Sequence, residues 1–414
     1  MRSTAALGYA SVFISAALYW LGFSMIRPVL PLYFSDHGYK AAAIGLFMAL
    51  NSILPIVFSM PIGSWIDRIG TRRAVLYGTV VSLTSGVAFV IGVSLGWTWL
   101  ILLGQVINGI GGLLSWGALQ AAASLSVDRK ADKSRSNRVL SNFTFVNSLA
   151  QLAGPSLGGF LSDWGGYTTI FLIFVAMNAA ALLMTTFLPP ARAEVTGPDP
   201  VAGDQPDWQQ ALWRSYATGF GLMRRNKPFS MAILLNGIMF MLVDLRSTFF
   251  PLYLDNLGLS HTVIGWVLSV SGLAVLIVRP FTGYAINRLG QYRIMMASMI
   301  VGGVSLLLLT LRPEILLLSV IMFLWGASTG INQPMALIMV SQAVEPKEQG
   351  MGMTIRTMSN RVVQLTNPLF FGAVTTVIGL SMGFGFMGVL LLCAGALYSR
   401  QNRRERARSY EAPS

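Results

Sequence analysis

Long apolar stretches, each about the length needed to cross a bilayer, most constrain the fold of this chain. A helix needs ~20 mostly apolar residues to span ~30 Å of hydrocarbon, and in one continuous segment only a helix satisfies its own backbone polar groups there. About twelve stretches of this kind are present: roughly 7–34, 41–63, 73–95, 98–125, 139–161, 167–188, 229–254, 261–284, 293–311, 315–341, 351–378 and 380–399. With only 11% charged residues, the chain is predicted to be an all-α membrane protein with twelve transmembrane helices.

A short polar hairpin occurs twice. Residues Gly63 to Arg73 have the sequence G-S-W-I-D-R-I-G-T-R-R, and 220 positions later Gly283 to Arg293 have G-Y-A-I-N-R-L-G-Q-Y-R. The segment Pro31-Leu32-Tyr33 recurs as Pro251-Leu252-Tyr253 at the same offset. A shared register over the first three helices predicts two six-helix, pseudo-symmetric halves related by an axis along the membrane normal.

These halves set the predicted domain boundaries. Residues 1–188 form the N-terminal six-helix bundle and residues 229–399 the C-terminal bundle. The intervening residues 189–228 begin with Pro, Gly and Asp, a composition typical of a linker, and we expect them to be cytoplasmic. Residues 400–414 form a basic cytoplasmic tail that would lie against anionic headgroups of the lipid bilayer.

The distribution of positive charge predicts the orientation. Most of the 29 Lys and Arg residues fall in predicted loops and tails on one side of the membrane, whereas Lys40 and Arg312 lie on the other. By the positive-inside rule, both termini are cytoplasmic. The net charge of +13 therefore indicates membrane topology, not nucleic-acid binding. We expect a multi-pass protein of a bacterial inner (cytoplasmic) membrane.

Charged residues within spans are costly, so each is a candidate for function. Asp244 and Arg246 are two residues apart and cannot pair on one helix, so Asp244 is expected to pair with Arg27 or Arg361. A carboxylate in such a setting can titrate, which makes Asp244 the candidate proton-coupling residue. Arg279 lies near a helix end and is expected to extend toward the headgroups.

Together with polar and aromatic residues of other spans, these groups form a predicted transport cavity. Arginines outnumber carboxylates in it, which favours an anionic or zwitterionic solute. The predicted cavity residues are Arg27, Asn108, Trp116, Asp244, Arg246, Asn332, Gln333, Arg356, Arg361 and Gln364.

The hairpin resembles the signature of the major facilitator superfamily between helices 2 and 3, although Thr71 stands where a basic residue is common. The resemblance covers nearly the whole chain and implies a transporter in which helices 1, 4, 7 and 10 line a central cavity. It also implies that the hairpin latches the two halves in one access state. The residues that would form this latch are Gly63, Asp67, Arg68, Gly70, Arg72, Arg73 and Asp128.

A second stretch, in helix 5, resembles the family's antiporter motif G-P-x-x-G-G, which is associated with exporters. Its matching residues are Gly154, Pro155, Gly158 and Gly159. Proline bends a helix and glycines allow a neighbour to approach closely. Gln105 stands where proton-coupled members usually carry an arginine, which leaves the driving ion open.

We therefore expect an exporter of a polar metabolite, siderophore-like natural product or drug, acting by proton antiport. The alternative is a proton-coupled importer of a small organic anion, and a membrane sensor or enzyme comes third. The two histidines, His37 and His261, lie in predicted outer loops, and Cys393 is the single cysteine. Without an enzyme motif or Walker lysine, we expect no enzymatic activity, cofactor, metal or nucleic-acid partner. The expected partners are a small-molecule substrate and protons or another coupling ion, and the protein is expected to function as a monomer.

Overall fold

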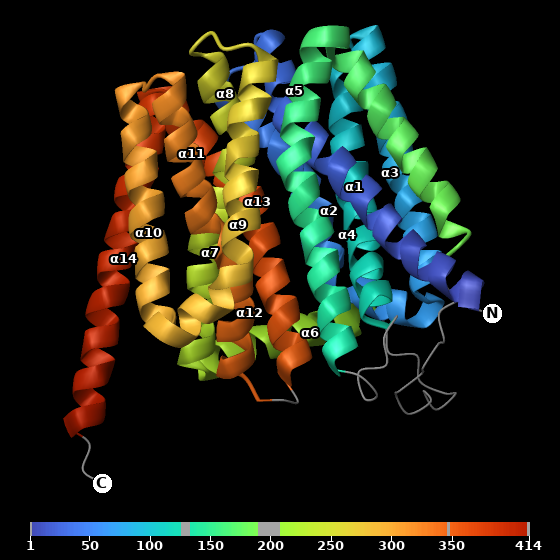
Figure 1. Cartoon of the computed structure of the whole chain (residues 1–414). Coiled ribbons are helices and arrows are strands. Elements are labelled where there is room, and N and C mark those ends of the chain that lie inside the picture. The colour runs from blue at the N-terminus through green and yellow to red at the C-terminus, as the bar shows by residue number, and fades with distance from the viewer. Residues whose placement is uncertain (1, 126–132, 189–207, 346–347, 412–414) are drawn as a thin grey trace.

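The computed structural model describes residues 2–125, 133–188, 208–345 and 348–411, and all regular elements in these ranges are helices (Figure 1). The elements are α1 (Arg2–Asp36), α2 (Ala41–Ile69), α3 (Thr71–Leu95), α4 (Thr98–Leu125), α5 (Lys133–Thr185), α6 (Trp208–Arg225), α7 (Lys227–Thr248), α8 (Phe250–Asp255), α9 (His261–Leu289), α10 (Gln291–Leu308), η1 (Leu309–Leu311), α11 (Ile315–Gly330), α12 (Asn332–Ala343), α13 (Gln349–Ile378) and α14 (Leu380–Glu411). The predicted all-α class is confirmed.

Ten helical segments among the described residues are long and apolar enough to cross a membrane. One of them, Asn142–Thr185, covers two predicted spans, and Gly166, with φ 69°, breaks the helix between them. The helix α13 has 30 residues but is too polar to count among the ten. The chain is thus a multi-pass membrane protein, and the number of twelve helices stays a prediction.

The repeated hairpin has one backbone conformation in both halves. Gly70, between α2 and α3, has φ 83° and ψ 151°, and Gly290, between α9 and α10, has φ 84° and ψ 151°. This region of backbone space is almost restricted to glycine. The helices α2 and α9 both have 29 residues and begin and end at the 220-residue offset seen in the sequence. The predicted repeat is therefore structural as well as sequential.

The two halves meet mainly along two helix pairs, α5 with α9 and α2 with α13. Glycines permit the closest approach in both pairs. A Cβ atom at Gly265 of α9 would collide with the carbonyl oxygen of Pro155 in α5, and one at Gly45 of α2 would collide with that of Pro368 in α13. Gly45 and Gly265 correspond at the 220-residue offset, so the interface itself carries the internal symmetry.

Both termini lie at the same end of the bundle, the lower end in Figure 1. We call the opposite end, where α1 and α8 finish and α9 begins, the distal end. Large side chains near it are almost completely buried, among them Tyr33, Phe34, Phe249 and Phe250. Their cluster draws residues from both halves, so the halves are packed together toward the distal end.

Several predicted boundaries change. The span predicted over 229–254 is interrupted at Phe249, which separates α7 from α8. Within the predicted linker, residues 208–225 form the helix α6, and the Tyr216 hydroxyl donates a hydrogen bond to the Ile56 carbonyl of α2 at 2.8 Å. The predicted tail, 400–414, continues α14 as a helix to Glu411. Apolar periodicity does not reveal such breaks and extensions because they depend on packing partners.

The glycine contacts between halves predict the effect of a small substitution. A Cβ at Gly159 of α5 would collide with the carbonyl of His261 in α9, so Gly159→Ala should force the helices apart and cost about 1–3 kcal/mol. Thermal unfolding of the detergent-purified protein measures this loss. Gly283→Ala is the matched control, because a Cβ there has no neighbour within 4 Å. Equal unfolding temperatures for both variants would contradict the tight packing.

Candidate functional site

One ion pair joins the two halves in the middle of the bundle. Arg27 in α1 donates from Nη2 to Asp244 Oδ1 in α7 at 2.7 Å, and the two side chains are 19% and 2% exposed. Asn367 in α13 donates to the other carboxylate oxygen at 2.9 Å. The Arg27 guanidinium also lies 5.6 Å from the centre of the Phe23 ring. Of the two partners predicted for Asp244, Arg27 is confirmed.

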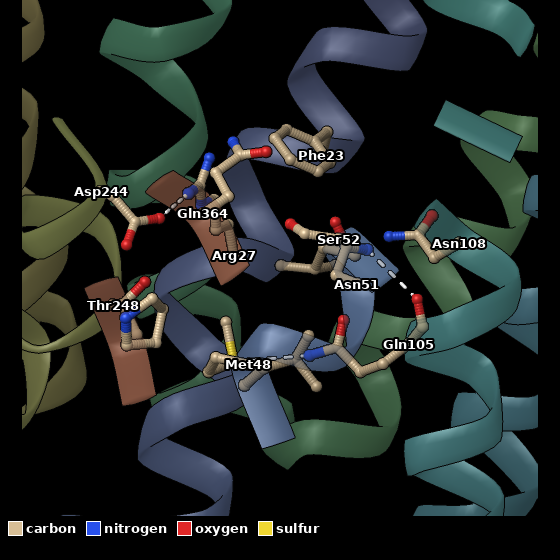
Figure 2. A pocket seen from close by; sticks show the side chains of 13 residues that line it. Phe23, Arg27, Met48, Asn51, Ser52, Gln105, Asn108, Asp244, Thr248 and Gln364 are labelled. Carbon is tan, nitrogen blue, oxygen red and sulfur yellow. Dashed lines mark hydrogen bonds and ion pairs between the residues drawn. The ribbon is translucent and has the colours of Figure 1, made fainter. Parts of the chain in front are cut away.

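The pair borders a small central cavity between the halves (Figure 2). Its volume is about 30 Å³, enough for one or two water molecules and far below the ~300–1,000 Å³ of pockets that hold drug-sized ligands. The cavity is lined by Phe23, Ile26, Arg27, Leu30, Met48, Asn51, Ser52, Gln105, Asn108, Asp244, Thr248, Gln364 and Pro368. The halves must separate before an organic solute can enter.

Four of the ten predicted cavity residues line this space, namely Arg27, Asn108, Asp244 and Gln364. They come from α1, α4, α7 and α13. The residues lining this space include members of α2 and α13 and none of α11 or α12, which correspond to the predicted helix 10. The other predicted residues are not among those that line this cavity: Trp116, Arg246, Asn332, Gln333, Arg356 and Arg361.

Two arginines make hydrogen bonds inside the protein. Arg246 in α7 donates to the Thr329 hydroxyl at 3.1 Å. Arg279 in α9 donates to Ser148 of α5 at 2.7 Å and to Gln333 of α12 at 3.1 Å. The prediction that Arg279 extends toward the headgroups is therefore wrong. Its distance from the helix end permitted that geometry, but polar partners on neighbouring helices satisfy the guanidinium instead.

On α13, Arg361 donates to Gln364 at 2.9 Å, as their three-residue spacing predicts. Two buried atoms nearby, Nε of Arg356 and Oδ1 of Asn332, have no hydrogen-bond partner among the described residues. Within the same residues, Arg27 is the only span arginine that pairs with a carboxylate. The interior of the C-terminal half thus carries unneutralised positive charge.

Trp116 packs against three aromatic side chains. Its ring lies against Tyr19, Trp20 and Phe143, with centroid distances of 6.4, 4.7 and 5.2 Å. All four residues belong to the N-terminal half. Trp116 therefore packs helices of the N-terminal half together.

Sequence reasoning missed four polar residues of the cavity: Asn51, Ser52, Gln105 and Thr248. Asn51 in α2 donates to the Gln105 carbonyl of α4 at 3.2 Å, and the Gln105 amide lies 3.4 Å from the Met48 sulfur. The adjacent polar pair at 51–52 inside an apolar span was a usable signal. The cavity therefore contains an amide at the position where the resemblance to the superfamily implies an arginine.

Comparison with known proteins decides the family. The family model of the Major Facilitator Superfamily matches residues 12–260 and again residues 232–414, and the two matches together cover nearly the whole chain. The chain belongs to the Major Facilitator Superfamily. As a member it is a secondary transporter of small molecules and not an enzyme. In most members of the superfamily, movement of the substrate is coupled to movement of an ion.

Several curated relatives are drug-efflux proteins of this superfamily. The chain is 25% identical over 352 residues to a multi-drug resistance efflux pump PmrA homolog of Lactococcus lactis, covering 80% of each chain. It is 24% identical to the multidrug resistance protein MdtG of Klebsiella pneumoniae, covering 95% of this chain and 94% of that one. With the class E tetracycline resistance protein of Escherichia coli the identity is also 24%, over 90% and 87% of the chains.

Solved structures share the superfamily fold at lower identity. A peptide transporter POT in complex with sulfate has a TM-score of 0.78 at 16% identity, with 96% of this chain and 94% of that chain covered. The nucleoside transporter NupG has a TM-score of 0.76 at 13% identity, with 95% and 99% covered. These similarities concern the fold alone.

The superfamily hairpin is only partly visible. Asp128 lies outside the described residues, and for Gly63 and Asp67 the structure describes only the helical backbone. Arg68 and Arg73 are exposed, and Arg72 donates to the Thr186 carbonyl within its own half at 2.9 Å. The latch between halves that we expect from these residues and Gly70 stays a prediction.

The helix 5 motif lies at two interfaces. A Cβ at Gly154 would collide with Ser24 of α1, and one at Gly158 would meet the Met25 carbonyl at 2.5 Å. On the other side, Gly159 and Pro155 contact α9 of the opposite half. The motif therefore allows α5 to lie close to α1 of its own half and to α9 of the other half, as the predicted close approach requires.

A double-mutant cycle tests the central ion pair. Arg27→Gln should destabilise the protein, because removing one partner of a buried pair leaves an uncompensated charge and typically costs about 3–5 kcal/mol. Adding Asp244→Asn to it should restore part of the stability, since no buried charge then remains unpaired. Thermal unfolding of both single variants and the double variant measures the coupling. Simple additivity would contradict direct pairing.

Proposed function

We propose that this transporter exports a small polar solute that carries both an anionic and a cationic group, in exchange for protons. The Arg27–Asp244 pair carries the proposal, because it offers one buried charge of each sign at the cavity between the halves. The efflux proteins among the relatives support the outward direction. Metabolites, siderophore-like natural products and zwitterionic drugs all fit this class.

The opposite charges of the pair give the coupling. A cationic group of the solute binds ionised Asp244, while an anionic group binds Arg27. A proton on Asp244 removes the negative charge, so the proton and the cationic group compete for one site. Competition means that each lowers the affinity of the other. Alternating opening to the two sides then converts competition into exchange.

Excess positive charge near the pair sets the preference for solutes with an anionic or acceptor group. Arg246, Arg356 and Arg361 have no carboxylate partner among the described residues. Their charges favour negative groups within the low-dielectric interior. When the halves separate, we expect these side chains to border the enlarged cavity.

The same pair also favours a second function. A solute with only negative charge would compete with Asp244 for Arg27, and the displaced carboxylate would bind a proton more readily. Proton and solute would then bind together and move in the same direction, as in a proton-coupled importer of organic anions. The amide of Gln105 in the cavity, in place of the arginine typical of proton-coupled exporters, favours this alternative.

The orientation follows from charge. With the termini and the basic hairpins at one end of the bundle, we place that end in the cytoplasm of a bacterial cell and the distal end outside the inner membrane. A single chain supplies both halves of the pathway, so we propose that the monomer is the working unit. The hairpin latch would act at the cytoplasmic end.

Transport in inverted membrane vesicles with an acidic interior tests direction and coupling. A panel of zwitterionic drugs should include a solute that accumulates inside, and Asp244→Asn should reduce gradient-driven accumulation by about tenfold or more. Glu314→Gln, which removes an exposed distal carboxylate, should leave it unchanged. If only intact cells accumulate a solute, and that solute is a singly charged anion, the importer hypothesis would replace the exporter hypothesis. Unaltered coupling in Asp244→Asn would refute the role of Asp244.

A further inference from the structure

A cluster of metal-ligating groups joins the two halves at the distal end, far from the central cavity. Asp36 ends α1, Asp255 ends α8 and His261 begins α9. One ligand atom from each lies within 4.8 Å of the others. The imidazole Nε2 of His261 is 3.9 Å from Asp36 Oδ2. The three residues are separated by up to 225 positions in the chain, and only the fold brings them together.

Neighbouring side chains hold each of the three groups in place. The Ser35 hydroxyl donates to Asp255 at 3.0 Å, and the Tyr167 hydroxyl donates to Asp36 at 2.5 Å. Each carboxylate therefore has one oxygen oriented by a hydroxyl. The Asp36 oxygen that accepts from Tyr167, Oδ2, is also the one that lies 3.9 Å from His261 Nε2. The hydroxyl thus orients this oxygen toward the histidine, as hydrogen bonds orient the carboxylates of metal sites.

The histidine has the orientation of a metal ligand. Its Nδ1 lies 2.8 Å from the Ser162 hydroxyl and 3.7 Å from the carboxylate of Asp163. Asp163 is itself fixed by the backbone N–H of Thr262 at 2.7 Å. With Nδ1 facing these oxygens, Nε2 faces Asp36. A carboxylate or hydroxyl behind one ring nitrogen and a free second nitrogen is the arrangement that orients histidine toward a metal.

The cluster lacks a balancing positive charge. Among the described residues, neither Lys nor Arg forms an ion pair with Asp36, Asp163 or Asp255. The basic group close to Asp36 and Asp163 is the imidazole of His261. Two adjacent carboxylates beside an imidazole are best neutralised by a dication.

We propose that Asp36, Asp255 and His261 bind a divalent transition metal of the Zn²⁺ type, with water as a fourth ligand. One imidazole nitrogen and two carboxylate oxygens suit Zn²⁺, whereas Ca²⁺ and Mg²⁺ prefer oxygen ligands in larger number. Ligand atoms around Zn²⁺ lie ~2.0–2.2 Å from the metal. The site would contract slightly on binding, which the exposed end of α1 at Asp36 permits.

The metal would act on the conformational cycle. Asp36 belongs to the N-terminal half, and Asp255 and His261 belong to the C-terminal half, so a bound metal links the halves at the distal end. A ligand that binds one conformation better than another shifts the population toward it. Zn²⁺ would therefore stabilise the conformation closed at the distal end and slow transport. This inference depends on alternating access in the superfamily and not on the proposed solute or proton coupling.

Metal-dependent thermal unfolding of the purified full-length chain, with any polyhistidine tag removed, tests the site. ZnCl₂ should raise the unfolding temperature of the wild type, because a ligand of the folded state adds stability that grows with its concentration. MgCl₂ and CaCl₂ should not do so at equal concentration. His261→Ala and Asp36→Asn should each weaken the Zn²⁺ response by at least about tenfold in concentration.

His37→Ala is the matched control. His37 is the chain's other histidine, lies one residue after Asp36 and contacts only the Tyr33 carbonyl through Nδ1 among the hydrogen bonds described. Its removal should leave the Zn²⁺ response unchanged. Should His261→Ala fail to fold, Asp255→Asn carries the same prediction.

Two outcomes would overturn the site: a wild type insensitive to Zn²⁺, or a response that His37→Ala removes and the three ligand variants retain. Solute exchange by reconstituted protein provides the functional readout, because Zn²⁺ added at the distal side should slow the wild type and spare Asp36→Asn. Thermal unfolding needs no solute, so a failed transport proposal leaves this test intact.

Discussion

The cost of placing charge in a low-dielectric interior governs the centre of this protein. Asp244 is almost completely buried, and two donors from different helices, Arg27 and Asn367, satisfy its carboxylate. Arg27 belongs to the other half, so neutralising the carboxylate also joins the halves. Any step that separates them must give each charge a new partner. In the proposed function, a charged solute or a proton supplies that partner.

Internal duplication shapes everything around this pair. The hairpin glycines Gly70 and Gly290 share one rare backbone conformation, and Gly45 and Gly265 make equivalent contacts across the interface. Backbone geometry has thus been kept in both halves where helices turn or touch. The distribution of charge differs between the halves: the span arginines that have no carboxylate partner among the described residues lie in the C-terminal half. The backbone at the turns and contacts is therefore symmetric, whereas the distribution of charge between the halves is not.

The distal end and the centre of the bundle differ in how they hold the halves together. At the distal end, side chains from both halves form hydrogen bonds around His261 and pack a shared apolar cluster. At the centre, the cavity of about 30 Å³ has collapsed around the ion pair. Such a closed arrangement is one conformation of a two-state machine, in which small changes at the contacts shift the balance.

The sequence by itself determined the all-α membrane class, the duplicated architecture and the superfamily, because span length, charge distribution and the repeated hairpin are local properties of the chain. It also limited the partners of Asp244 to two arginines, since a two-residue spacing excludes Arg246. Only the tertiary structure decided between Arg27 and Arg361, placed Arg279 on Ser148 and Gln333, and brought Asp36 to His261. Those outcomes depend on how helices rotate and pack against each other, and periodicity along one helix carries no information about the side chains of another.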